Sequence, residues 1–171
     1  MTPTVRPAEP SDAVALIALA NAVAGEPEGW LLSDGAWRSA TEERRYLRVL
    51  RRDSNGAVFV AEEAAEIVGR LTIRRDPHPS SAHVADFGLM VAAAHRGRGV
   101  GKALLAVAEK WAGGAGVTKL ELHVFPHNEP AIGLYEKLGY EREGYRRVHY
   151  RRPDGRFVDA ILMAKLLVST S

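Results

Sequence analysis

Three glycines and four basic or imidazole side chains fall within eight consecutive residues, His95 to Lys102, just before an apolar stretch with helical spacing. Backbone N–H groups at the start of a helix attract anions, and glycines allow a ligand to approach the backbone closely. Arg96, Arg98 and Lys102 would add charge-assisted hydrogen bonds to phosphate oxygens. The segment therefore predicts a phosphate-binding loop. The alternative is a solvated basic turn that only caps the helix.

The loop does not match either of two well-known nucleotide-binding motifs. A mononucleotide-binding loop has the pattern G-x-x-x-x-G-K followed by Ser or Thr. This chain has Arg96 in place of the first glycine and Ala103 in place of the hydroxyl residue. A dinucleotide-binding loop has a third glycine where this chain has Lys102. A nucleotide hydrolase is therefore disfavoured, and an anion site built from backbone N–H groups remains.

The composition predicts one domain, residues 1–171, that is cytoplasmic and binds small molecules. Because 23 Lys and Arg stand against 21 Asp and Glu, the net charge of +2 gives no general attraction to nucleic acid or membrane. The absence of cysteine excludes disulfides and thiolate chemistry. No histidine spacing is typical of a metal site, so we predict no metal. No apolar run has the length of a signal peptide or a membrane span.

Hydrophobic periodicity and turn residues predict the elements that would position the loop. Leu120, Leu122 and Val124 alternate with polar residues as in a strand, and apolar residues recur at helical spacing from Val100. Expected strands cover 4–6, 57–63, 67–75, 83–91, 119–125, 140–150 and 156–166. Expected helices run from the N-cap Ser11 to Val23, from Trp37 to Arg51, from Val100 onward, and from the N-cap Asn128 to Gly139. This order predicts an α/β fold with a mixed sheet.

Two motifs together resemble the GNAT family of N-acetyltransferases. The sequence RGRGVG, residues 96–101, is similar to that family's acetyl-CoA signature, Q/R-x-x-G-x-G/A. About 30 residues later, NEPAIGLYEKLGY, residues 128–140, resembles its second motif, in which an Asn opens a helix that carries a Tyr. The resemblance covers residues 57–166 well and the first 50 residues only loosely.

This resemblance implies a fold and a co-substrate. The fold is a mixed, mostly antiparallel sheet of about seven strands with about four helices, splayed between the fourth and fifth strands. The co-substrate is acetyl-CoA, whose pyrophosphate the loop would hold and whose pantetheine arm would pair with the preceding strand. A backbone N–H near Met90 would face the thioester oxygen. The implied binding residues are Leu89, Met90, Val91, Arg96, Gly97, Arg98, Gly99, Val100, Gly101, Lys102, Asn128 and Tyr135.

Acetyl transfer to a primary amine needs a base for the amine and an acid for the departing thiolate. The resemblance assigns the acid to Tyr135, whose plainer reading is a half-buried packing residue. Asp86 lies where many relatives carry a glutamate that acts through water, and it is the favoured base. His83, Glu121 and His123 are the alternatives, although polar strand residues commonly just face solvent.

The acceptor amine stays open at this stage. The resemblance implies a small amine or an amino acid, or a protein N-terminus, and a homodimer formed through the closing strands. A cationic acceptor would suit the acidic and aromatic residues Glu26, Glu28, Trp30, Asp34 and Trp37. A carboxylate-bearing acceptor would suit Arg146, Arg147, Arg151 and Arg152. The alternative function is a coenzyme A-binding or sensing module without turnover.

Overall fold

The computed structural model describes residues 2–32 and 38–167, which contain a seven-stranded sheet of order β1-β2-β3-β4-β5-β7-β6. The strands are β1 (Thr4–Pro7), β2 (Gly56–Glu63), β3 (Glu66–Arg75), β4 (Val84–Val91), β5 (Lys119–Val124), β6 (Glu141–Arg151) and β7 (Phe157–Leu166). The β4–β5 pair is parallel, and the other neighbouring pairs are antiparallel. The predicted mixed, mostly antiparallel sheet is confirmed.

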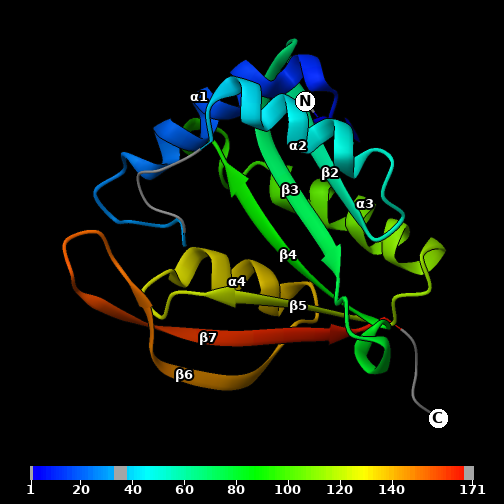
Figure 1. Ribbon diagram of the computed structural model, residues 1–171. Coiled ribbons are helices and arrows are strands. Elements are labelled where there is room, and N and C mark those ends of the chain that lie inside the picture. The colour runs from blue at the N-terminus through cyan, green and yellow to red at the C-terminus, as the bar shows by residue number, and fades with distance from the viewer. Residues whose placement is uncertain (1, 33–37, 168–171) are drawn as a thin grey trace.

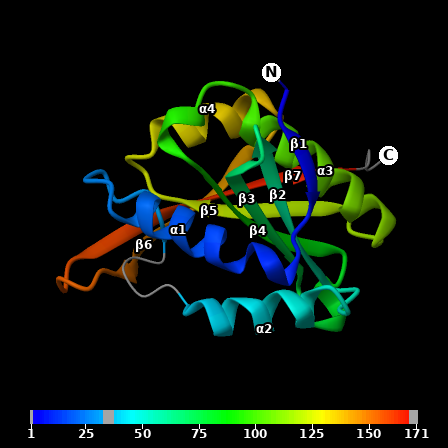
Figure 2. The ribbon, with the colours of Figure 1, turned by 90° about the horizontal axis from the view of Figure 1, so that it is seen from above.

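Helices cover both faces of this sheet, as Figure 2 shows. They are α1 (Ala13–Ala24), α2 (Ala40–Leu50), α3 (Val100–Gly114) and α4 (Glu129–Lys137). The helices α1 and α2 lie on one side, and α3 and α4 lie on the other. None of these described helices is long and apolar enough to cross a bilayer.

The side of the sheet that faces α3 and α4 carries the largest hydrophobic core. Leu120, Leu122 and Val124 of β5 lie in one buried cluster with Phe87 of β4 and Leu104 of α3. Their spacing of two residues puts them on one face of the strands, so the predicted alternation along β5 is confirmed. On the other face of β4, Met90 packs beside Leu19, Ala20 and Val23 of α1.

The start of the first long helix differs from the prediction. It begins at Ala13, after a short 3₁₀ turn over Pro10–Asp12, so Ser11 is not its N-cap. Asp12 explains the difference, because its carboxylate accepts the Glu9 N–H at 2.7 Å and the Arg6 guanidinium at 2.8 Å. A carboxylate with two such partners organises the turn before the helix more strongly than a serine hydroxyl would.

Two other helix starts have recognisable caps. Ser39 and Glu42 form a capping box at the start of α2, whose predicted first residue, Trp37, lies outside the described residues. Asn128 caps α4 as predicted, since its side-chain oxygen accepts the Ala131 N–H at 3.3 Å. The cap therefore fixes where the second motif begins.

The two parallel strands diverge after a short paired section. Val84–Asp86 pair with Lys119–Glu121, and no pairing continues beyond Asp86 and Glu121. Figure 1 shows β4 and β5 separating toward the end that meets the loop before α3. The edge of β4 from residue 87 onward therefore has no strand partner on its β5 side among the described residues. This is the predicted splay between the fourth and fifth strands.

Candidate active site

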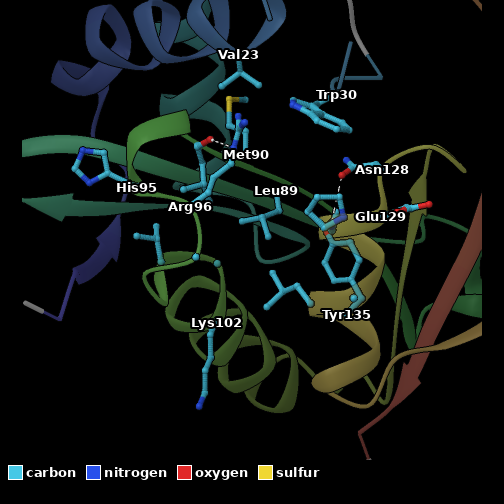
Figure 3. A pocket seen from close by; sticks show the side chains of 18 of the residues that line it. Val23, Trp30, Leu89, Met90, His95, Arg96, Lys102, Asn128, Glu129 and Tyr135 are labelled. Carbon is cyan, nitrogen blue, oxygen red and sulfur yellow. Dashed lines mark hydrogen bonds between the residues drawn. The ribbon is translucent and has the colours of Figure 1, made fainter. Parts of the chain in front are cut away.

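A cavity of about 600 Å³ lies at the open end of the splay. Its walls come from the end of β4, the loop before α3, the start of α4 and the residues that follow α1. Figure 3 shows Trp30 and Asn128 close together at one wall, with Tyr135 next to them and Val23 and Met90 on another side. All twelve predicted binding residues except Arg98 line this cavity. The sequence motifs thus converge on one site.

The glycines of the loop have two different functions in the fold. Gly97 and Gly99 have positive φ angles of 72° and 88°, and a Cβ on either would meet no atom within 4 Å. They therefore shape the turn and leave its backbone open to a ligand. A Cβ on Gly101 would lie 2.9 Å from Cδ2 of Leu134, so this glycine allows α3 to pack against α4.

Arg96 does not point its charge toward a phosphate position but is held by Glu26. Both terminal nitrogens donate to the Glu26 carboxylate at 2.6 Å, and Nε donates to the Val91 carbonyl at 3.0 Å. The Arg96 guanidinium in turn lowers the pKa of the Glu26 carboxyl below its ordinary value. Arg96 therefore fastens the segment after α1 to the end of β4.

The other basic residues of the loop have different surroundings. His95 Nδ1 lies 2.8 Å from a carboxylate oxygen of the buried Glu63, and Arg98 lies 3.4 Å from the same oxygen. Lys102 extends along α3 away from Tyr135 (Figure 3). The anion-attracting groups at the cavity that no acidic side chain engages are thus the backbone N–H groups at the start of α3 and Lys102, which also lines the cavity.

Tyr135 places a hydroxyl group at the wall of the cavity from within an aromatic cluster. Its ring packs edge-to-face against Phe87 and Tyr140, with centroid distances of 5.9 Å and 5.8 Å. Its side chain lines the cavity, and its hydroxyl makes no hydrogen bond with any described residue. Burial raises the pKa of the phenol well above its ordinary value, and the hydroxyl is neutral at neutral pH. The proton remains available to a group in the cavity.

Three of the four candidate bases share one face of the sheet. Asp86 and Glu121 are directly paired, and His123 follows Glu121 by two residues. Paired residues and alternate residues point to the same side of a sheet, which here is the α1 side, opposite Tyr135. His83 lies before β4, where its carbonyl accepts the Thr118 N–H at 2.8 Å. The expectation that His83 lies in the strand is therefore wrong.

The protonation of Asp86 and His123 is shifted in opposite directions. Although solvent reaches Asp86, desolvation by the surrounding sheet raises the pKa of its carboxyl, which makes it a stronger base than a free aspartate. Burial, followed by the charges of Arg146 and His149, lowers the pKa of His123, so its imidazole is neutral near pH 7.

No three His, Asp or Glu side chains within 2–32 and 38–167 are placed to hold a metal ion.

The segment 25–32 closes the cavity through several contacts. The Trp30 indole N–H donates to Glu26 at 3.0 Å, and its ring stacks on His127 at 5.7 Å. His127 Nε2 donates to the Glu28 carbonyl at 2.9 Å. Glu26 is therefore engaged by Arg96 and Trp30, which weakens the idea of a free carboxylate for a cationic acceptor. Asp34 and Trp37, the other members of that set, lie outside the described residues.

Sequence reasoning missed two of the site's pairings. Glu26 and Arg96 are 70 residues apart, and Tyr150 and His123 are 27 apart. No local spacing indicates either pair, because both depend on how distant segments meet. The sequence indicated Arg152 as part of a basic run for an acceptor carboxylate. In the structure Arg152 instead donates to the Leu31 carbonyl at 2.7 Å.

Comparisons with known proteins agree with this geometry. The profile of the acetyltransferase (GNAT) family matches residues 25–140. The L-amino acid N-acetyltransferase AaaT of Escherichia coli (strain K12) is 36% identical over 138 residues, which are 78% of this chain and 77% of that protein. A GNAT-family acetyltransferase structure from Streptococcus pneumoniae has a TM-score of 0.87 at 29% identity, covering 96% of this chain and 99% of the other.

A second structure shares the fold at lower identity. The putative acetyltransferase yncA from Salmonella typhimurium, solved with its cofactor acetyl-CoA, has a TM-score of 0.86 at 20% identity over 100% of this chain and 97% of the other. The family profile spans more than half of this chain, and the relative from E. coli covers more than two thirds of it. The protein therefore belongs to the GNAT family of acetyltransferases and is an acyltransferase enzyme.

Proposed function

We propose that this protein transfers the acetyl group of acetyl-CoA to the primary amine of a free amino acid, by direct attack in a ternary complex. Family membership supports the reaction type. The name of the E. coli relative, an L-amino acid N-acetyltransferase, supports the acceptor class. The acetyl-CoA in the Salmonella typhimurium structure supports the donor. The cavity, which joins a helix N-terminus to an unpaired strand edge, fits a phosphate-bearing ligand with a peptide-like arm.

Different parts of the site would bind different parts of acetyl-CoA. The N–H groups of residues 97–102 would hold the pyrophosphate where Gly97 and Gly99 leave the backbone open. The free edge of β4 at Leu89, Met90 and Val91 would pair with the amides of pantetheine, and the Asn128 side chain lies on the same wall. Arg96 would contribute by holding the loop and the segment 25–32 together.

The proposed reaction moves protons in two opposite directions. Asp86, acting through water, takes a proton from the acceptor ammonium, and the neutral amine attacks the thioester carbon. The C–S bond breaks as the amide bond forms, and Tyr135 donates its proton to the departing thiolate. The nitrogen loses its second proton as the amide forms, and this proton passes through water to the Tyr135 phenolate. Asp86 releases the first proton to solvent. The products are an N-acetyl compound and coenzyme A with a free thiol. The observation that carries this proposal is the unbonded Tyr135 hydroxyl inside the cavity.

A thiol-release assay tests this function. We expect the protein with acetyl-CoA to release free thiol when free L-amino acids are added, and more slowly with polyamines or peptides. Coenzyme A binding without turnover on any amine would instead identify a binding or sensing module. A homodimer and a cytoplasmic location stay predictions, and the sedimentation velocity of the purified protein would test the first.

A further inference from the structure

The face of the sheet on the α1 side carries charged side chains on β4 and β6 that no helix covers. The register places Asp86 beside Glu121, His123 beside Leu162, and Arg146 beside Ala160. Ala160 and Leu162 are two residues apart on β7, so the side chains of Asp86, His123 and Arg146 share one side of the sheet. This is the side that α1 and α2 occupy over the earlier strands. Figure 2 shows the β6–β7 hairpin projecting past the end of α1.

Tyr150 occupies the middle of this face and is held in place there. It pairs with Val158 of β7, which puts it on the same side as Arg146. Its hydroxyl and His123 Nδ1 share a hydrogen bond of 2.8 Å. Its ring contacts the rings of His149 and Phe125 at centroid distances of 4.7 Å and 5.9 Å. Three neighbouring rings, those of His123, His149 and Phe125, thus fix one hydroxyl group on an otherwise open surface.

Opposite charges act on this hydroxyl from two sides. Arg146 lowers and Asp86 raises the pKa of Tyr150, although burial has the largest effect and the net shift is upward. The register agrees with this, because β4 with Asp86 and β6 with Arg146 lie on either side of the strand that carries His123, the hydrogen-bond partner of Tyr150. Arg146 has no ion pair or hydrogen bond with any residue in the part of the chain that the structure describes. The face consequently presents a carboxylate on one side of the His123–Tyr150 pair and a cation on the other.

The structure separates Arg146 from the other arginines of the predicted basic run. Arg152 donates to the Leu31 carbonyl and lies over the Phe125 ring at 5.1 Å. Arg151 lies over Phe157 at 5.9 Å. Arg147 acts electrostatically on Asp159, which alternates with Ala160 and so lies on the opposite side of β7. Only Arg146, among these four, combines the open face with an unpaired guanidinium.

We propose that this face binds the acceptor as a zwitterion, with Arg146 taking the α-carboxylate of an amino acid and Asp86 receiving its ammonium group. The proposal rests on the amino-acid acetyltransferase function given above. An α-amino acid carries both charges on one carbon, so it matches a surface that offers both countercharges around one hydroxyl. An amine without a carboxylate leaves Arg146 unused, so Arg146 selects amino acids over simple amines.

Paired acceptors test the assignment directly. Each L-amino acid of a small panel is compared with its carboxamide, which keeps the side chain and the amine but lacks the carboxylate. We expect Arg146→Gln to raise KM for the acids by about tenfold or more, while KM for the carboxamides changes by less than about twofold. Arg146→Lys should retain part of the preference for acids. The intrinsic difference in amine basicity cancels, because each variant is compared with the unmodified enzyme on the same two compounds.

Arg147→Gln is the matched control, because it removes the same charge from the adjacent residue on the same strand. It should leave the ratio of acid to carboxamide unchanged. An equal loss on acids and carboxamides in Arg146→Gln, or an equal effect of Arg147→Gln, would overturn the assignment of Arg146 while leaving the acetyltransferase function standing. Thiol release with no amine at all would overturn the proposed function itself. Unchanged coenzyme A binding by each variant establishes that the fold is intact.

Discussion

Tyr135 and Tyr140 lie in one aromatic cluster around Phe87, but their hydroxyl groups have different surroundings. The Tyr140 hydroxyl donates to Glu109 at 3.4 Å on the side away from the cavity. The Tyr135 hydroxyl has no partner among the described residues and borders the cavity. Packing therefore explains both rings, and the position of its hydroxyl at the cavity distinguishes Tyr135 from Tyr140.

Replacing each tyrosine by phenylalanine separates packing from acid catalysis. We expect Tyr135→Phe to lower turnover by about 10²-fold with little change in coenzyme A affinity, since only a proton donor is removed. Initial thiol release at saturating acetyl-CoA measures this. Tyr140→Phe is the control and should keep turnover within about threefold, because its hydroxyl lies outside the cavity. Equal turnover in Tyr135→Phe and the unmodified enzyme would make Tyr135 a packing residue.

The place of Tyr135 at the cavity could be predicted from a motif, but the arrangement of the candidate bases could not. Periodicity along 119–125 correctly puts Glu121 and His123 on one side of a strand. It cannot show that Asp86 is paired with Glu121, since this depends on the register of two strands more than 30 residues apart. The bond from His123 to Tyr150 likewise depends on a third strand that lies between β5 and β6.

At the scale of elements, the segment 25–32 connects parts of the site that belong to different helices and strands. Glu26 binds Arg96 in the loop before α3, and Trp30 stacks on His127 before α4. Arg152 after β6 donates to the Leu31 carbonyl. The segment thus reaches both the donor loop and the hairpin that carries the proposed acceptor residues, as the upper left of Figure 1 indicates.

The Glu26–Arg96 pair should make this fastening sensitive to acid. The pKa of Glu26 is lowered in the folded protein, so the pair stabilises the fold fully above the ordinary carboxyl pKa and is lost as pH falls through the lower folded value. Glu26→Gln should cost roughly 0.5–1 kcal/mol near pH 7 and little near pH 3. Thermal unfolding at both pH values measures the difference.

Glu28→Gln provides the control for this prediction. The hydrogen bond of Glu28 to His127 uses its backbone carbonyl, so the variant should unfold like the unmodified protein at either pH. A Glu26→Gln protein that loses as much stability at acid pH as at neutral pH would show that the ion pair does not fasten the segment.

The sequence analysis assigned the three loop glycines one role, but the structure shows that Gly101 has a different role from Gly97 and Gly99. Gly97 and Gly99 have backbone angles suited to glycine, as a tight turn before a helix requires. Gly101 has no such angle and is needed because α4 approaches α3 at that point. The signature fixes the spacing of these glycines, but helix packing, which the sequence does not display, explains the third.

Valine substitutions at two of these glycines should therefore affect different properties, coenzyme A binding at Gly99 and stability at Gly101. Gly99→Val should weaken coenzyme A binding by about tenfold or more, because a branched side chain resists the positive φ and hinders approach to the backbone. Gly101→Val should instead lower the free energy of unfolding by about 1–3 kcal/mol through the contact with Leu134. Calorimetric binding and urea unfolding measure the two effects. Unchanged coenzyme A affinity in Gly99→Val would reduce the loop to a helix cap.

Across the whole molecule, the site forms where the two halves of the sheet separate. The helices α1 and α2 pack on the half of the sheet that ends at β4, beside the gap. A buried ion pair joins the two layers: Arg70 of β3 and Glu43 of α2 are 2.7 Å apart, with 2% and 0% of their side chains exposed. Arg70 is directly paired with Met90, which lines the cavity. The pair therefore links the packing of α2 on β3 to β4, the neighbouring strand that lines the cavity.

Breaking this pair should be among the most destabilising single changes on the α2 side of the protein. Glu43→Gln leaves the Arg70 charge buried without its carboxylate, which typically costs about 3–5 kcal/mol. The double variant Glu43→Leu with Arg70→Met should lose less, because two apolar side chains avoid burying a charge that has lost its carboxylate. Asp154→Asn, which removes the partner of the exposed Arg156, should leave the urea midpoint unchanged and serves as the control. If the double variant unfolds at lower urea than Glu43→Gln, the pair stabilises α2 through its own attraction, and the desolvation argument is wrong.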